Sequence, residues 1–278
     1  MRAAASDRPP SRLTPAPLLR WPWAIDDTRP MLAHLQGLAR SLRIYYGSPA
    51  RLRRMGRLYR QFVRPGDLAF DIGAHVGDRT LVLSRLGARV VALEPQPGPR
   101  RILRLLHGRR AGVTVVAAAA SSAPGRLTLR ISRRHPTVSS ASPAFLDRVQ
   151  GAVSFAGVVW PDRIEVEATT LDRLIATHGE PAFVKIDVEG FEREVLAGLA
   201  RPVRALSFEY LAETIPLALA CVDRLEELGR HRYNASSGES LELALPEWTD
   251  ADGIRGFLAG RPPDSGSGDV YACHAERC

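Results

Sequence analysis

The sequence predicts an α/β fold organised around a mostly parallel sheet. Short apolar runs alternate along the chain with segments of helical spacing, and the first run, residues 68–72, is apolar except for Asp71. A strand with apolar residues on both sides is typical of a parallel sheet that helices cover on both faces. Acidic residues stand at the ends of four expected strands: Asp71, Glu94, Asp187 and Glu209. Ligands of open α/β sheets bind beyond the carboxyl ends of the strands, so one crevice is expected to collect these acids.

Residues 68–94 form the most informative unit. Gly73 and Gly77 open a tight turn after the first strand, and the helix that follows has its apolar residues at helical spacing. A second buried strand spans residues 90–93, and Glu94 stands at its end. Such a β-α-β unit cradles a nucleoside, because the turn lets the ligand approach the backbone and the acid accepts hydrogen bonds from the ribose hydroxyls.

The charge around the turn indicates which nucleoside is bound. A dinucleotide site usually has the spacing Gly-x-Gly-x-x-Gly and places a pyrophosphate against the turn. Here the spacing is Gly-x-x-x-Gly, and the Asp71 carboxylate would repel a phosphate. S-adenosylmethionine carries an ammonium and a sulfonium, and both suit a carboxylate. The residues expected at this cofactor are Asp71, Gly73, His75, Gly77, Glu94 and, in the loop after the third strand, Ser121.

Composition limits the class of protein. The 278 residues suffice for one large α/β domain or at most two small ones. The formal net charge is +8, but Lys185 is the one lysine among 38 basic residues and the 30 acids are interspersed, which disfavours a nucleic-acid partner. The three cysteines have no metal-binding spacing. Without an apolar run of ~20 residues or a signal peptide, the expectation is a cytoplasmic protein without a membrane span.

The remaining segments follow in order along the chain. Residues 1–29 are expected to form a flexible arm, 30–64 a helical lead-in of two short helices, and 65–278 the catalytic domain. Within the domain, a helix is predicted at 97–107 and at 217–228, and strands at 113–118, 125–132, 164–169, 183–186, 203–208, 231–235 and 269–273. Residues 133–161 break this rhythm, and two interpretations remain open for them: an acceptor-binding lid, or surface decoration.

Asp187 is the first candidate for chemistry. Methyl transfer from a sulfonium is an in-line displacement, so the enzyme aligns the acceptor and removes a proton from a hydroxyl. Asp187 is expected to act as that base or to orient the acceptor, with Glu189 as the second choice. Lys185 lies two residues before Asp187 and therefore on the same side of the strand, where it is either catalytic or half of a structural ion pair.

The sequence constrains the chemical class of the acceptor and the presence of a metal less tightly. The Asn/Asp-Pro-Pro-aromatic run usual in amino-directed methyltransferases is absent, and no cysteine is placed for pyrimidine methylation, which favours an oxygen acceptor. Asp187, Glu189 and Glu209 offer oxygen ligands that suit a divalent metal. Hydrogen-bonded carboxylates explain the same residues, and the site is predicted without a metal.

Several motifs in this order resemble those of the FkbM family of S-adenosylmethionine-dependent methyltransferases. They are residues 70–77 (FDIGAHVG), 92–95 (ALEP), 170–172 (TLD), 184–192 (VKIDVEGFE) and 268–272 (GDVYA). The resemblance covers about residues 40–275. It implies a Rossmann-like class I methyltransferase fold with a seven-strand, mostly parallel sheet whose last strand is antiparallel. It also implies O-methylation of a hydroxyl on a secondary metabolite or a sugar. His75 departs from the asparagine that the family commonly has, and residues 133–161 are longer than expected.

Other classes remain as alternatives. An NAD(P)-dependent oxidoreductase would use the same kind of sheet, but Asp71 and the glycine spacing disfavour it. A non-catalytic nucleoside-binding protein would lack the acids at Asp187 and Glu189. An RNA methyltransferase would show its arginines gathered beside the crevice. The sequence leaves the acceptor and the oligomeric state open.

Overall fold

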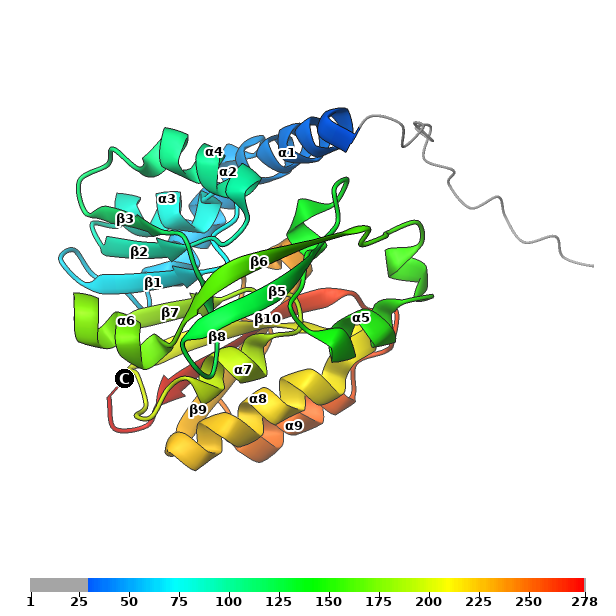
Figure 1. Cartoon of the computed structure of the whole chain (residues 1–278). Helices are drawn as coiled ribbons and strands as arrows, with labels where there is room; N and C mark the ends of the chain where they lie inside the picture. Colours follow the sequence, from blue (N-terminus) through cyan, green and yellow to red (C-terminus); the bar gives the residue numbers. More distant parts are fainter. Residues whose placement is uncertain (1–29, 278) are drawn as a thin grey trace, which may run out of the picture.

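The computed structural model describes residues 30–277, and the arm expected at 1–29 lies outside the described residues. A seven-stranded sheet forms the middle layer (Figure 1). Its spatial order is β3 (Val113–Val116), β2 (Arg89–Leu93), β1 (Leu68–Ile72), β7 (Phe183–Ile186), β8 (Ala205–Leu211), β10 (Ser267–His274) and β9 (His231–Ser237). Every pair from β3 to β8 is parallel, whereas β10 is antiparallel to both β8 and β9. The expected seven-strand sheet with an antiparallel last strand is therefore confirmed.

The strand order reverses beside β1. The chain passes from β1 to β2 and β3 on one side, and β7 returns to pair with the other side of β1. The carboxyl ends of β1 and β7 lie next to each other, since Asp71 is the register partner of Lys185 and Ile72 that of Ile186. Such a switch point is where ligands bind in open α/β sheets.

Helices bury both faces of the sheet. One face packs against α6 (Leu171–His178), α7 (Glu192–Ala197), α8 (Ile215–Leu228) and α9 (Ala251–Ala259), and the other against α2 (Pro49–Tyr59), α3 (Asp78–Arg85) and α4 (Pro97–His107). Along β1 the side chains alternate between the two cores, with Phe70 and Ile72 in the first and Ala69 in the second. This double burial explains why the strand is apolar almost throughout.

A second sheet stands beside the first. Its order is β4 (Ala119–Ala120), β6 (Asp162–Thr169) and β5 (Gly125–Ile131), with β5 and β6 antiparallel. The strand predicted at 113–118 is therefore divided, because β3 ends at Val116 and the chain then crosses to the small sheet. The sequence predicted these strands without indicating that they leave the main sheet.

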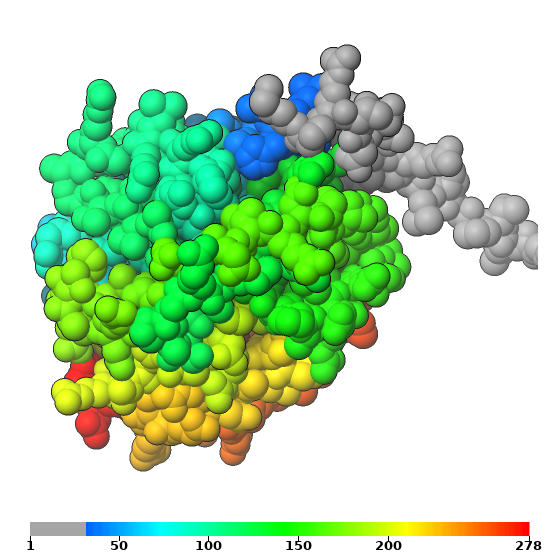
Figure 2. Space-filling view, in the orientation of Figure 1, coloured from blue at the N-terminus to red at the C-terminus, as the bar shows by residue number. Residues whose placement is uncertain are grey.

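The insertion at 133–161 connects β5 to β6. It contains η1 (Pro136–Val138), α5 (Pro143–Val149) and η2 (Val153–Phe155). In Figure 2 the green atoms, which belong to the insertion and to β5 and β6, lie across this face of the molecule between the teal and the yellow parts. Its inner side is packed, with Phe145 and Val149 almost fully buried, whereas Val153 is 88% exposed.

Two helices precede the sheet. The first, α1 (Pro30–Tyr46), lies against η1, and α2 packs against α3. Ser48 begins α2 by accepting a hydrogen bond on its hydroxyl from the Arg51 amide, and Met55, Leu58 and Tyr59 form the buried side of the helix. Among the described residues, no helix combines the length and apolar character needed to cross a membrane.

Candidate active site

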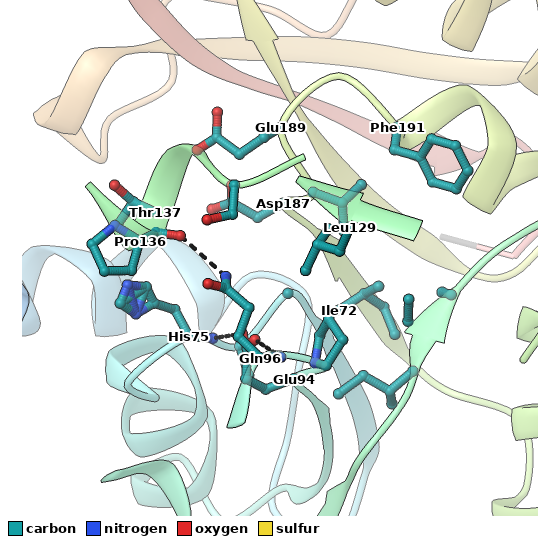
Figure 3. Close-up of a pocket in the computed structure, with 18 of the residues that line it drawn as sticks. Ile72, His75, Glu94, Gln96, Leu129, Pro136, Thr137, Asp187, Glu189 and Phe191 are labelled. Carbon is teal, nitrogen blue, oxygen red and sulfur yellow. Dashed lines mark hydrogen bonds between the residues drawn. The ribbon is translucent and has the colours of Figure 1, made fainter. Parts of the chain in front are cut away.

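A pocket opens at the switch point between β1 and β7 (Figure 3). Its empty space, counted together with the open solvent at its mouth, is about 820 Å³. The walls come from α1 and the start of α3, from the turns after β1, β2 and β7, from the segment after β3, from β5 and from the insertion. The lining includes Tyr45, Ile72–His75, Asp78, Arg79, Leu93–Gln96, Ala118–Ala120, Leu129, Pro136, Thr137, Ser139, Ala141, Asp187–Glu189 and Phe191.

The turn after β1 needs its unusual residues for geometric reasons. Gly73 has φ +82°, and a Cβ atom at this position would lie 1.8 Å from the Asp187 carbonyl oxygen. His75 also adopts a left-handed conformation, with φ +49°, which histidine and asparagine tolerate better than most residues. Burial lowers the pKa of His75 to about 4, so its ring is neutral. Gly73 and His75 line the pocket as the sequence suggested.

Glu94 closes this turn from β2. Its Oε2 accepts a hydrogen bond from the His75 amide at 2.8 Å, and its Oε1 accepts one from the Gln96 amide at 2.7 Å. Burial raises the pKa of Glu94 to about 7, partly offset by these two amides. The carboxylate lies in the pocket wall (Figure 3), and its remaining lone pairs give it the capacity to accept hydroxyl donors.

Two residues expected at the cofactor lie behind the turn instead. Asp71 is fully buried, does not line the pocket, and accepts a hydrogen bond from Thr80 Oγ1 at 2.5 Å. Burial raises its pKa to about 6. Gly77 begins α3 with φ +87°, and a Cβ there would meet Leu103 and His107. Asp71 lies on the same side of β1 as Ala69, so its side chain points toward α3. Gly77 lies against Leu103 and His107 of α4.

Ser121 also lies away from the pocket. It is buried, its amide donates to the Thr169 carbonyl, and its own carbonyl is packed against Gly198. Because the chain has already crossed to the small sheet, Ala118–Ala120 line the pocket in its place. The sequence predicted a cofactor contact at Ser121, and the residues that line the pocket lie one to three positions earlier.

Asp187 lies in the opposite wall, at the end of β7. Its Oδ2 is 3.2 Å from an Arg79 guanidinium nitrogen and 3.4 Å from Lys185 Nζ. Burial alone would raise the pKa of Asp187, but these two cations outweigh burial and lower it to about 2. Asp187 is therefore an ionised carboxylate that faces the pocket.

Lys185 lies beneath the pocket rather than in it. Its side chain is fully buried, and Nζ donates to Asp269 Oδ1 at 2.8 Å and to the Ile186 carbonyl at 3.1 Å. Because Lys185 does not line the pocket, it cannot touch a ligand there in this arrangement. The geometry places it as a support for the Asp187 carboxylate, which was the second of its two sequence interpretations.

The turn after β7 carries Glu189 into the pocket wall. Glu189 has φ +55°, and its carbonyl accepts a hydrogen bond from Ser140 Oγ at 2.6 Å. Burial, together with the charge of Asp187, raises the pKa of Glu189 well above its usual range. Gly190 follows with φ +84°, and a Cβ there would lie 2.5 Å from the Phe145 side chain. The insertion is therefore packed directly on this turn.

Three carboxyl groups meet at this end of the pocket. Single oxygen atoms of Asp187, Glu189 and Glu209 lie within 4.8 Å of one another. The sequence assigned Asp187 and Glu209 to one crevice. The structure brings their carboxyl groups together, but Glu209 lies within β8 and does not line the pocket. Oxygen atoms at such spacing suit a divalent cation or a hydroxyl-rich ligand.

Among the lining residues that the sequence interpretation missed are Tyr45, Arg79 and Gln96. Tyr45 comes from α1, 142 residues away from Asp187 in sequence, and no local signal marks it. Arg79 lies in the first turn of α3, where a cation opposes the helix dipole, and this was the available signal. Gln96 directly follows the Glu94-Pro95 pair and stands at the N-cap position of α4, where its side chain makes no hydrogen bond to the helix.

A family model and a curated relative match part of this chain. The model of the methyltransferase FkbM domain matches residues 71–231. A curated relative from Streptomyces tacrolimicus, the 31-O-demethyl-FK506 methyltransferase FkbM, is 34% identical over 160 residues, which are 49% of this chain and 61% of that protein. The chain thus spans less than two thirds of that relative's length.

Similar solved structures are more distant. A TehB-like SAM-dependent methyltransferase from Corynebacterium glutamicum is 11% identical over 88% of this chain and 100% of that chain, with a TM-score of 0.47. An O-methyltransferase from Bacillus cereus in complex with SAH is 15% identical over 90% and 92%, with a TM-score of 0.44. Likenesses this weak say nothing about activity. The family model covers more than half of the chain, and the chain therefore belongs to the FkbM methyltransferase family, whose methyl donor is S-adenosylmethionine.

Proposed function

We propose that this protein transfers the methyl group of S-adenosylmethionine to a hydroxyl oxygen of a small molecule, a secondary metabolite or a sugar. One observation carries the proposal: a single pocket has a nucleoside-type carboxylate, Glu94, in one wall and an ionised carboxylate, Asp187, in the other. The catalytic domain is assigned to residues 65–278, and the acceptor side to the insertion at 133–161.

The cofactor occupies the side of the pocket formed by β1 and β2. Gly73 lets the turn after β1 pack against the Asp187 carbonyl and lines the pocket beside the ligand. His75 contacts the ligand, and Glu94 accepts hydrogen bonds from the ribose hydroxyls. The backbone of Ala118–Ala120 borders the adenine. Asp71 and Gly77 act indirectly, because they fix the turn from beneath.

Asp187 serves the acceptor. Its carboxylate accepts a hydrogen bond from the acceptor hydroxyl and orients the oxygen toward the methyl carbon. As the C–O bond forms and the S–C bond breaks, the sulfonium becomes a neutral thioether and the oxygen becomes strongly acidic. Asp187 then takes the proton, although its lowered pKa makes it a weak base. Glu189 is the second candidate for this role.

Two features support an oxygen acceptor. The chain has no run of the kind that grips a planar nitrogen, and the relative from Streptomyces tacrolimicus is by its name a 31-O-demethyl-FK506 methyltransferase. The wall beside Asp187 combines acidic groups with the apolar side chains Leu129 and Phe191, which suits a hydroxyl on a partly apolar scaffold.

Calorimetric titration with S-adenosylhomocysteine, beside NAD and NADP, tests the cofactor. Micromolar binding of S-adenosylhomocysteine alone is expected, and Glu94→Ala should abolish it. Binding of NAD or NADP instead would favour the oxidoreductase, and binding of none of the three would favour a protein without this cofactor. A screen of hydroxyl and amine acceptors with labelled S-adenosylmethionine then tests the oxygen assignment.

The proposed reaction runs without a metal. Lys185 and Arg79 already balance the charge of Asp187, so we expect methyl transfer to be unchanged after EDTA treatment and dialysis. Restoration of lost activity by Mg²⁺ or Mn²⁺ would instead assign a divalent cation to Asp187, Glu189 and Glu209.

A further inference from the structure

Gln96 occupies the pocket wall next to the ribose carboxylate. It is 8% exposed and lines the pocket, and its backbone N–H donates a hydrogen bond to Glu94 Oε1 at 2.7 Å. Its side chain has one satisfied end and one unsatisfied end: Nε2 donates to the Pro136 carbonyl at 3.1 Å, whereas Oε1 is buried and meets no donor among the described residues (Figure 3). A buried oxygen without a donor is unfavourable until a ligand supplies one.

The orientation of this side-chain amide is fixed by chemistry. The Pro136 carbonyl oxygen can only accept a hydrogen bond, so the group that faces it must be the NH₂ of Gln96. The other end is then Oε1, which can only accept. A ligand atom that satisfies Oε1 must therefore be a hydroxyl or an amino donor.

The partner of Gln96, the short helix η1, is held from three directions. Trp160 Nε1 donates to the Val138 carbonyl at 2.7 Å, and Gln96 binds Pro136 from the cofactor side. From α1, Gly37 lies so close that a Cβ there would be 2.9 Å from both the Arg133 carbonyl oxygen and Pro136 Cδ. Pro136 and Thr137 line the pocket, so a shift of η1 reshapes the wall on the acceptor side.

We propose that Gln96 is a positioning residue that couples occupancy of the nucleoside site to the placement of the acceptor-side insertion. Its Oε1 accepts a hydrogen bond from a ribose hydroxyl of the bound cofactor, and this contact holds the side chain in the orientation in which Nε2 binds Pro136. Cofactor binding thereby fixes η1, and the acceptor then meets a completed wall. The inference rests on the proposed function.

Gln96→Met tests the coupling, because methionine has a similar length and volume but no amide. Trp160→Phe is the matched control, since it removes another hydrogen bond to η1 from a residue outside the pocket. Gln96→Ala repeats the test if the methionine variant does not fold. The measurements are calorimetric titration with S-adenosylhomocysteine, and hydrogen exchange in peptides that span residues 133–142, with and without saturating S-adenosylhomocysteine.

In the unmodified protein, S-adenosylhomocysteine should slow exchange in residues 133–142. In Gln96→Met its affinity should fall about three- to tenfold, as for one lost hydrogen bond, and saturation should no longer slow exchange. Trp160→Phe should speed exchange but keep both the affinity and the response to S-adenosylhomocysteine.

If saturated Gln96→Met shows the same slowing as the unmodified protein, the coupling is wrong while the proposed function stands. If the unmodified protein does not bind S-adenosylhomocysteine, the cofactor assignment fails, and this inference fails with it.

Discussion

The two turns that face each other across the pocket share a backbone feature. His75, after β1, and Glu189, after β7, both adopt a left-handed conformation, with φ +49° and +55°. Leu241 is the one other non-glycine residue with positive φ within residues 30–277. Backbone conformations of this kind are unfavourable and persist where the surrounding structure imposes them, often at functional sites.

The contacts that impose the two conformations differ. The His75 amide is held by Glu94, only 19 residues away and inside the same β-α-β unit. The Glu189 carbonyl is held by Ser140, 49 residues away in the insertion, and the next residue, Gly190, packs against Phe145. The cofactor side is therefore fixed by one continuous segment, whereas the acceptor side is assembled from distant ones. Substitutions should therefore affect cofactor binding and the acceptor side separately.

Asp187→Asn should have the largest effect, and it should be confined to the acceptor side. Turnover should fall about 10²- to 10⁴-fold, the usual contribution of a proton acceptor, while the affinity for S-adenosylhomocysteine stays within about threefold. Single-turnover methyl transfer and calorimetry measure the two quantities. Full turnover in this variant would make Asp187 a structural residue.

Glu94→Ala should weaken cofactor binding. Two charge-assisted hydrogen bonds to the ribose are worth about 3–6 kcal/mol together, so the affinity for S-adenosylhomocysteine should fall at least about 100-fold. Glu94→Gln keeps one oxygen acceptor, and its loss should be smaller. Equal affinities of both variants and the unmodified protein would exclude Glu94 from the ribose site. Circular dichroism checks that the fold remains.

The pH dependence distinguishes the two walls, because burial raises the pKa of Glu94 to about 7 while Asp187 stays ionised. Binding to the ionised Glu94 should weaken about tenfold from pH 8 to pH 6, and Glu94→Gln should remove this trend. The stability of the free protein should change in the opposite sense. A carboxyl whose pKa is raised in the folded state stabilises below about pH 4.5, and this contribution is lost as the pH rises through about 7.

Calorimetry and thermal unfolding across this pH range measure the two trends. Glu192, with its pKa also raised to about 7 by burial, and Asp71, with its pKa raised to about 6, add to the stability trend in the same direction. Affinity that does not vary with pH in the unmodified protein would contradict the role of Glu94.

Gly37→Ala should have the smallest effect, again on the acceptor side. The added methyl group would meet Arg133 and Pro136 and displace η1, so the KM for the acceptor should rise roughly fivefold. Alanine favours a helix by about 1 kcal/mol, which helps the protein stay folded. Gly56→Ala in α2, where the new Cβ has one ordinary contact with Val82, is the control. An unchanged KM in Gly37→Ala would show that η1 does not shape the acceptor wall.

The fold was largely predictable because its signals are local. The strand at 68–72 and the helix at 97–107 occur with the predicted bounds, and the closing strand extends the predicted 269–273 by one to two residues at each end. Buried parallel strands and proline-initiated helices leave short, strong patterns. The residues that line the pocket were predictable where they lie within these units, as for Gly73, His75 and Glu94.

What the sequence could not predict depends on contacts between distant segments. Asp71 stands at the end of β1, but whether its side chain faces the ligand or the α3 side depends on the sheet register and the packed helices. Tyr45 reaches the pocket because α1 lies across η1. Ser121 lies outside it because the chain had crossed to a second sheet, and no periodicity distinguishes two sheets.

The position of Lys185 makes it a chemical probe for local opening of the sheet. It is the chain's one lysine, and its side chain has no exposed surface at the centre of the sheet. A reagent that acylates lysine side chains can therefore reach its target only when β7 separates from its surroundings. The rate of labelling at this position would report directly on rare openings of the sheet centre. Its change on saturation with cofactor would measure how strongly the ligand holds the two halves of the sheet together.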